Sequence, residues 1–356
     1  MFSQSAELPH LTGLRAIAAL MVMLLHLSQM HGHFLEKYFV MVQQGYLGVD
    51  IFFVLSGYIL SHVYASSFQN YSARVHCRFL WRRFARLYPV HIATLGALVI
   101  MVGSRGLLDT NFWIINEIPR HLLLANAWTD NLAWNIPAWS ISAEWLVYLL
   151  FPLFVWMFLQ STTVIIPCLI CFGLLIGFQL FGISEGGIVH SFATWPAFWR
   201  VISEFALGVL GFRIALNFEP STKLDWIALI LFGIIFINPF EILQLVTIAI
   251  FVAVLARSDG FLCWILSTRI AVYLGTISYS VYMVHYPLLK LFKKLEDIFG
   301  ISYSGPVANI LLILALAIIT ICISALLYHV VEAPARRWLR RREVQLFEKH
   351  VEIVER

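Results

Sequence analysis

The chain has 356 residues, of which 60% are hydrophobic and only 12% are charged, and its formal net charge is +4. A charged fraction of about half that of a typical soluble domain argues against a disordered protein, a coiled coil and an ordinary soluble enzyme. Lys and Arg gather in the cytoplasmic loops of membrane proteins, so the positive charge does not indicate nucleic-acid binding. We predict an all-α, polytopic integral membrane protein.

Apolar runs near the length that crosses a bilayer, about 20 residues, recur along the whole chain. The seventh and eighth runs are short and flank Asn238-Pro239, so they form either two spans or one re-entrant hairpin. We therefore predict about ten transmembrane helices, with a range of eight to ten. In chain order the predicted spans are 12–31, 45–64, 87–104, 138–159, 163–182, 195–216, 224–238, 241–256, 270–289 and 306–330.

The chain has no Gly/Ser-rich or Pro-rich linker and no visible internal repeat. We predict one transmembrane domain, residues 1–335, followed by a basic cytoplasmic tail, residues 336–356. Lys and Arg concentrate between the second and third spans and after the tenth, which places both termini in the cytoplasm. The Cys168-x-x-Cys171 pair lies in an apolar run, where free cysteines behave as small buried hydrophobes, so we expect no metal site.

Ionisable side chains inside the predicted spans are candidates for function, because each costs about 2.5–3.5 kcal/mol at a helix centre. With a rise of about 1.5 Å per residue, five of them from five different spans fall in the outer third of the bilayer. Asp and His are too short to reach the interface from there, so we expect one buried polar chamber. The five residues are His26, Asp50, Glu144, Arg200 and His285.

Arg15 and His26 are eleven residues apart, which puts them on nearly the same helix face about 16 Å apart. One helix thus presents a cation at its cytoplasmic mouth and an imidazole deep in the membrane. This arrangement suits acyl-coenzyme A, which has phosphates at one end and a thioester at the other. An interfacial arginine beside an unrelated buried histidine is the alternative interpretation.

Two further groups of residues are candidates for the site. Arg83 and Arg86 are one helical turn apart in the basic run 74–86, and guanidinium groups bind phosphate through two parallel hydrogen bonds. A simple topology signal is the alternative for this run, and we interpret the run 336–342 as an anchor only. Glu144 and Tyr148 are four residues apart, on one face of the fourth span. Residues that we assign to acceptor binding are Trp139, Ser142, Tyr148, Arg200 and His285.

Six motifs in this order resemble the membrane-bound acyltransferase family 3, the group of O-antigen, exopolysaccharide and peptidoglycan O-acetylases. The likeness runs from Leu8 to about Trp338. The motifs are LTGLRAIAALMVMLLH with Arg15 and His26, GYLGVDIFFVLSGYIL (45–60) with Asp50, FLWRRFARLYP (79–89) with Arg83 and Arg86, WSISAEWLVYLLFP (139–152) with Glu144, ISYSVYMVHYPLL (277–289) with His285, and VVEAP (330–334).

The resemblance implies ten helices, an acyl-CoA donor with acetyl-CoA as the expected form, and an extracytoplasmic sugar acceptor. It also implies a catalytic His26 and donor binding by Arg15, Arg83 and Arg86. We therefore expect an O-acyltransferase, in particular an O-acetyltransferase, in a bacterial inner membrane among membrane lipids. Its acceptor would be a cell-surface glycan or a lipid-linked sugar, and it would hold no tightly bound cofactor.

In this hypothesis His26 takes a proton from the acceptor hydroxyl, and Asp50 or Glu144 orients its imidazole. A covalent acyl-histidine is a variant of the same chemistry. His285 is the rival base, although the adjacent Pro287 favours a structural or acceptor-positioning role. A proton-coupled transporter or exporter would use similar intramembrane residues, but transporters often carry internal repeats. A non-catalytic scaffold would leave the polar layer unexplained.

Overall fold

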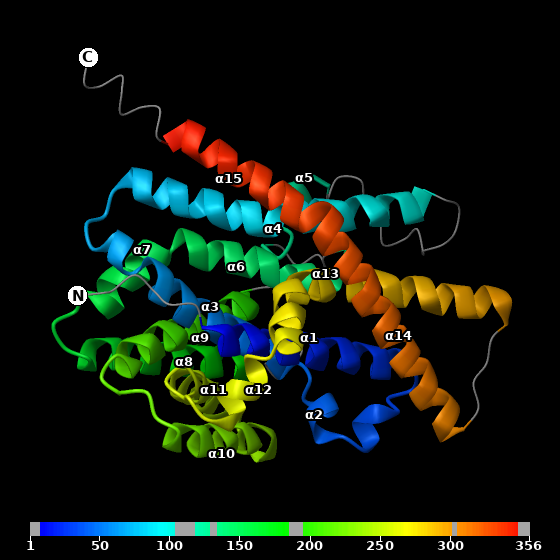
Figure 1. Ribbon diagram of the computed structural model, residues 1–356, viewed down its shortest axis with the longest axis horizontal. Helices are drawn as coiled ribbons and strands as arrows, with labels where there is room; N and C mark the ends of the chain where they lie inside the picture. The colour runs from blue at the N-terminus through cyan, green and yellow to red at the C-terminus, as the bar shows by residue number, and fades with distance from the viewer. Residues whose placement is uncertain (1–7, 104–117, 129–133, 185–194, 301–304, 348–356) are drawn as a thin grey trace.

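The computed structural model describes residues 8–103, 118–128, 134–184, 195–300 and 305–347, and these segments form a helical bundle (Figure 1). The predicted all-α class is confirmed. The longer helices are α1 (Pro9–Met30), α3 (Leu47–Tyr64), α4 (Ala73–Gly103), α6 (Trp139–Leu149), α8 (Ile165–Ser184), α9 (Trp195–Ala215), α10 (Lys223–Ile237), α11 (Glu241–Leu255), α13 (Arg269–Phe299), α14 (Pro306–Leu327) and α15 (Ala333–Phe347). The short helices are α2 (Val40–Gln43), α5 (Ile118–Leu122), α7 (Phe151–Phe154) and α12 (Phe261–Leu266), and the π-helical turns are η6 (Val155–Leu159) and η8 (Tyr328–Glu332).

Every predicted span falls on a helix or a pair of helices, but fewer helices meet the requirements for crossing a membrane. Within the described residues, four segments qualify by length and apolar character, or five if a bent pair counts as one span. Helix α10 has 15 residues and is about 22 Å long, shorter than a hydrocarbon core of about 30 Å. The total of ten spans and the cytoplasmic termini stay predictions. The four segments are Pro9–Met30, Leu47–Tyr64, Ala73–Met101 and Pro306–Phe347.

The predicted fourth span, 138–159, is broken in the structure. Helix α6 ends at Leu149, and the helical stretch that follows is inclined to it by 56°. Pro152 lies in the first turn of α7, where a backbone N–H would have no partner within the helix, so the proline costs no hydrogen bond. A proline is therefore well placed to start the new direction, and the break lets α6 point its polar face into the bundle.

The centre of the bundle is held by helices whose backbones touch. Helix α1 packs against α3 and α13, and α3 packs against α9. A Cβ atom at Gly275 would lie 1.8 Å from the Thr12 carbonyl oxygen, and one at Gly208 would lie 2.1 Å from that of Val54. Small residues allow such close approach between membrane helices, where van der Waals packing drives association. The relative positions of α1, α3, α9 and α13 are fixed by these contacts.

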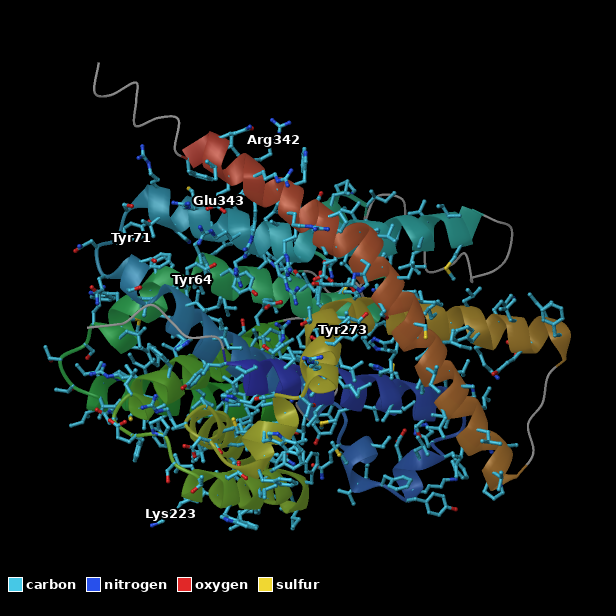
Figure 2. All side chains as sticks on the ribbon, viewed as in Figure 1. Tyr64, Tyr71, Lys223, Tyr273, Arg342 and Glu343 are labelled. Atoms are coloured by element: carbon cyan, nitrogen blue, oxygen red, sulfur yellow. The ribbon has the colours of Figure 1, made fainter. Side chains whose placement is uncertain are left out.

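The described part of the predicted tail is helix α15, which packs on α4 (Figures 1 and 2). The Glu343 carboxylate of α15 accepts hydrogen bonds from Arg78 and Arg82, and the Trp81 indole N–H donates to the Leu339 carbonyl at 2.9 Å. Just before α15, the π-helical turn η8 carries Glu332 into the bundle. This carboxylate lies 2.5 Å from Nη1 of Arg86 and accepts from the Ser280 hydroxyl at 2.7 Å.

Replacing Gly208 by alanine should destabilise the bundle, because the new methyl group must displace the backbone of α3. Overpacking of this kind costs about 1–3 kcal/mol. Gly233→Ala is the matched control, since a Cβ there meets nothing within 4 Å and alanine favours helix. Thermal unfolding in detergent should give a midpoint several degrees lower for Gly208→Ala only. Equal midpoints for the two variants would contradict this packing.

Candidate functional site

A cavity of about 110 Å³, here called the inner chamber, lies between α1, α3, α4, α6 and α13. Apolar side chains close much of its wall, and the polar ones come from all five helices. An enclosed space with a few converging polar groups is the usual form of a small-molecule site. Its polar lining residues are Arg15, Ser56, Arg83, Arg86, Ser140, Glu144, Tyr148, Tyr279 and Tyr282.

Glu144 and Tyr148 meet on one face of α6, as their spacing predicts. The Tyr148 hydroxyl donates a hydrogen bond to Glu144 Oε1, and the Ser56 hydroxyl approaches the same oxygen at 3.5 Å. Nearby, the Arg83 guanidinium lies over the Tyr148 ring at 6.0 Å. No described side chain forms an ion pair with Glu144, so its carboxylate is held by hydroxyl groups alone.

A second cavity of about 250 Å³, here called the basic cavity, adjoins the inner chamber. Arg15, Arg83 and Arg86 line both cavities, which therefore meet at these three guanidinium groups. The cavity also has two threonines in its wall, but none of the carboxylates in the described part of the chain lines it. Its lining residues are Thr12, Arg15, Arg82, Arg83, Arg86, Thr276, Arg336 and Arg340.

The positive charge of the basic cavity is only partly neutralised. Arg82 and Arg86 are paired with the carboxylates on α15 and η8, whereas Arg83 donates to the neutral Tyr64 hydroxyl at 3.1 Å. Among the arginines without such a partner, Arg15 and Arg336 are half-buried and Arg340 is exposed. Half-buried charges without partners are costly, and arginines in this state favour an anionic ligand. The lining arginines without a hydrogen bond or ion pair to any described residue are Arg15, Arg336 and Arg340.

The two candidate bases form a pair with each other. His26 Nδ1 lies 3.0 Å from His285 Nε2, and the rings stack with centroids 5.1 Å apart. His285 Nδ1 lies 3.2 Å from the Val281 carbonyl, which can only accept, so this nitrogen carries the proton. His285 Nε2 is then the acceptor and His26 Nδ1 the donor, an assignment that rests on the hydrogen-bond partners. The neutral His26 ring keeps an unprotonated Nε2.

The histidine pair does not line the inner chamber. Tyr282 does line it, and the Tyr282 ring is 5.8 Å from that of His285. The expectation of one shared chamber is therefore corrected: Tyr282 stands where the chamber and the histidine pair adjoin. Sequence spacing could not show this, because it gives depth along a helix but not the side chains that fill the space between helices.

Asp50 and Arg200 belong to a separate buried cluster that joins α3 to α9. Arg200 Nη2 lies 2.6 Å from both oxygens of Asp50, and Arg200 Nε lies 2.9 Å from Glu204 Oε1. Both carboxylates are fully buried. Asp50 is thus neutralised by Arg200 instead of orienting His26, and Arg200 faces carboxylates instead of the inner chamber.

Trp139 and Ser142, which we assigned to acceptor binding, have packing contacts outside the inner chamber. The Trp139 ring lies 6.4 Å from the Phe53 ring, and the fully buried Ser142 hydroxyl accepts the Ala127 N–H at 3.3 Å. Sequence reasoning missed several residues that line the two cavities. The spacing of four between Arg336 and Arg340 on a helix was an available signal for two of them. The missed polar residues are Thr12, Ser56, Arg82, Ser140, Thr276, Tyr279, Tyr282, Arg336 and Arg340.

Arg200→Met should destabilise the protein more than Asp50→Asn does. Loss of Arg200 leaves two buried carboxylates facing each other, and breaking a buried pair in this way costs about 3–5 kcal/mol. In Asp50→Asn the amide oxygen still accepts a hydrogen bond from Arg200, and the Glu204 carboxylate still neutralises the charge of Arg200. Arg213→Met is the control on the same helix, because Arg213 donates only to backbone carbonyls. Unfolding in detergent should rank Arg200→Met lowest, and a lower midpoint for Asp50→Asn would refute the ion cluster.

Comparison with known families gives a match over nearly the whole chain. The model of the family described as "Acyltransferase domain" matches residues 8–329. Among curated relatives, the putative peptidoglycan O-acetyltransferase YrhL of Bacillus subtilis is 27% identical, over 92% of this chain and 55% of its own length. The acyltransferase MdmB of Streptomyces mycarofaciens is 28% identical, over 94% of this chain and 93% of its own.

The O-acetyltransferase OatA of Staphylococcus aureus is 24% identical, over 93% of this chain and 57% of its own length. The chain thus spans just over half the length of two of these relatives and nearly all of the third. No solved structure matches the chain.

Proposed function

The chain belongs to the acyltransferase domain family, and on that premise we propose that it is a membrane O-acetyltransferase. The acyl donor is acetyl-CoA, which enters from the cytoplasm, and the acceptor is a hydroxyl of a cell-envelope glycan or a lipid-linked sugar. Relatives named as peptidoglycan or O-acetyltransferases support the acceptor class. The observation that carries the proposal is the basic cavity, whose unpaired arginines adjoin a polar chamber.

The donor's two ends fit the two ends of α1. The diphosphate binds at Arg15 and Arg83, which line both cavities and carry no carboxylate partner. From Arg15 to His26 the helix rises about 16 Å, a length that the extended pantetheine arm of coenzyme A can span. The arm lies in the inner chamber, and the thioester reaches His26 past Tyr282.

In the transfer step, His26 Nε2 accepts the proton of the acceptor hydroxyl. The hydroxyl oxygen attacks the thioester carbonyl carbon, the carbon–sulfur bond breaks, and the departing thiolate takes the proton back from His26. The His285 ring holds His26 through the Nδ1–H bond and so keeps Nε2 free for the reaction. In a catalytic triad a carboxylate accepts the hydrogen bond from the imidazole of the base, and here the His285 imidazole has that role.

His26→Ala should lower acetyl transfer by about 10²–10⁴-fold, the usual contribution of a general base. His285→Gln and His285→Leu form the matched pair, because glutamine retains an acceptor for the His26 N–H and leucine does not. We expect His285→Leu to lower kcat more than His285→Gln does, with a similar KM for acetyl-CoA. The assay follows transfer from acetyl-CoA to an acceptor glycan by protein matched for membrane abundance. Near-normal turnover of His26→Ala would remove this mechanism.

Arg83→Gln should raise the KM for acetyl-CoA about tenfold or more, because a charge-assisted bond to phosphate is lost. Arg74→Gln is the control, since Arg74 lies in the same basic run, is exposed, and lines neither cavity. The two substitutions remove equal charge from the run. If the run acts only as a topology signal, the two variants will have the same KM.

A further inference from the structure

Helix α15 turns two of its arginines into the basic cavity. Arg336 and Arg340 are four residues apart and both line it, with Arg336 half-buried and Arg340 exposed. Arg337 and Arg341 are exposed too, but they do not line the cavity. We propose that Arg336 and Arg340 form a phosphate subsite for the nucleotide end of the donor, the ribose 3′-phosphate of coenzyme A. The identity of the ligand rests on the proposed function. The subsite divides the run 336–342 into arginines that bind ligand and arginines that face outward.

The order of the lining residues places this subsite far from the reactive end of the ligand. Arg15, Arg83 and Arg86 border the inner chamber, but Arg336 and Arg340 line the basic cavity alone. A ligand with its thioester beyond the inner chamber therefore meets the shared arginines with its diphosphate. The groups that remain outside are the ribose, its 3′-phosphate and the adenine, and these lie at α15.

The balance of charge supports a ligand with several phosphates. Six arginines line the basic cavity, and two carboxylates, Glu332 and Glu343, are paired with lining arginines. The lining arginines outnumber these two carboxylates by four, and Glu343 is also shared with Arg78, which lies outside the cavity. The diphosphate of coenzyme A carries about two negative charges, and a phosphate monoester adds about 1.5–2 at pH 7. The negative charge of the nucleotide end thus matches the excess positive charge of the cavity. The two arginines of α15 supply the positive charge that the diphosphate leaves unneutralised.

Contacts outside the cavity hold the subsite in place. The Glu343 carboxylate of α15 accepts a hydrogen bond from Arg82 of α4, and the Trp81 N–H donates to the Leu339 carbonyl of α15. Arg336 and Arg340 take no part in these contacts. Their guanidinium groups are therefore positioned by the helix while their donors remain available, which is what bidentate phosphate recognition requires. Substituting them should leave the docking of α15 intact.

The test compares the double variant R336Q/R340Q with the matched control R337Q/R341Q, each purified in detergent and checked by thermal unfolding. The probes are adenosine 3′,5′-bisphosphate and adenosine 5′-monophosphate, and binding is measured by calorimetry. We expect the wild type to bind the bisphosphate roughly tenfold to a hundredfold more tightly, as hydrogen bonds to a charged group allow. R336Q/R340Q should lose that preference, and R337Q/R341Q should keep it.

The proposed subsite would be overturned if the wild type bound the bisphosphate no more tightly than the monophosphate. It would also be overturned if R336Q/R340Q kept the wild-type preference for the bisphosphate. Anionic phospholipid is the other source of phosphate. If the arginines bind its head group instead, adding phosphatidylglycerol vesicles will displace the bisphosphate from the wild type, and this result also counts against the proposal. Binding does not depend on acyl transfer. The two proposals can therefore be told apart. If R336Q/R340Q loses the preference for the bisphosphate while the wild type transfers no acetyl group from acetyl-CoA, the subsite is upheld and the proposed function is refuted.

Discussion

A charged side chain enclosed by apolar helices must be matched by an opposite charge, by hydrogen bonds or by a ligand. The structure uses each solution in a different place. Arg200 is matched by Asp50 and Glu204, in a cluster that joins α3 to α9. The Glu144 carboxylate is held by hydroxyl groups. Arg15 has neither kind of partner among the described residues, and it lies where the two cavities meet. The unmatched charge is therefore the place where we propose that the ligand binds.

Helix α1 connects the two ends of the site. It carries Arg15 near its start and His26 eleven residues later, and it packs against α13, the helix of His285. The close contact at Gly275 prevents α1 from sliding along α13 without a clash. The separation between the proposed phosphate-binding end and the imidazole pair is thus set by one rigid helix. Such preorganisation lets binding energy from the remote end of a substrate position its reactive end.

The sequence predicted those features that depend on local pattern. Apolar runs located the helices, and spacing placed Glu144 beside Tyr148 and Arg15 in line with His26. Contacts between distant segments could not be found in this way. His26 and His285 appeared as rivals because nothing in one sequence shows that residues 259 positions apart are hydrogen-bonded. Asp50 was assigned to His26 because depth alone does not say which of several nearby helices a carboxylate faces. The docking of α15 on α4 depends on Glu343, which no motif contains.

We propose that one extended ligand occupies both cavities, with its phosphates at the arginines and its reactive end at the histidine pair. A structure determined with a non-hydrolysable acetyl-CoA analogue, in which the thioester sulfur is replaced by a methylene group, tests this directly. We expect density for the diphosphate within hydrogen-bond distance of Arg15 and Arg83, and density for the acetyl group beside His26 Nε2. An analogue bound with its nucleotide away from these arginines, or with its acetyl group remote from His26, would contradict the proposal.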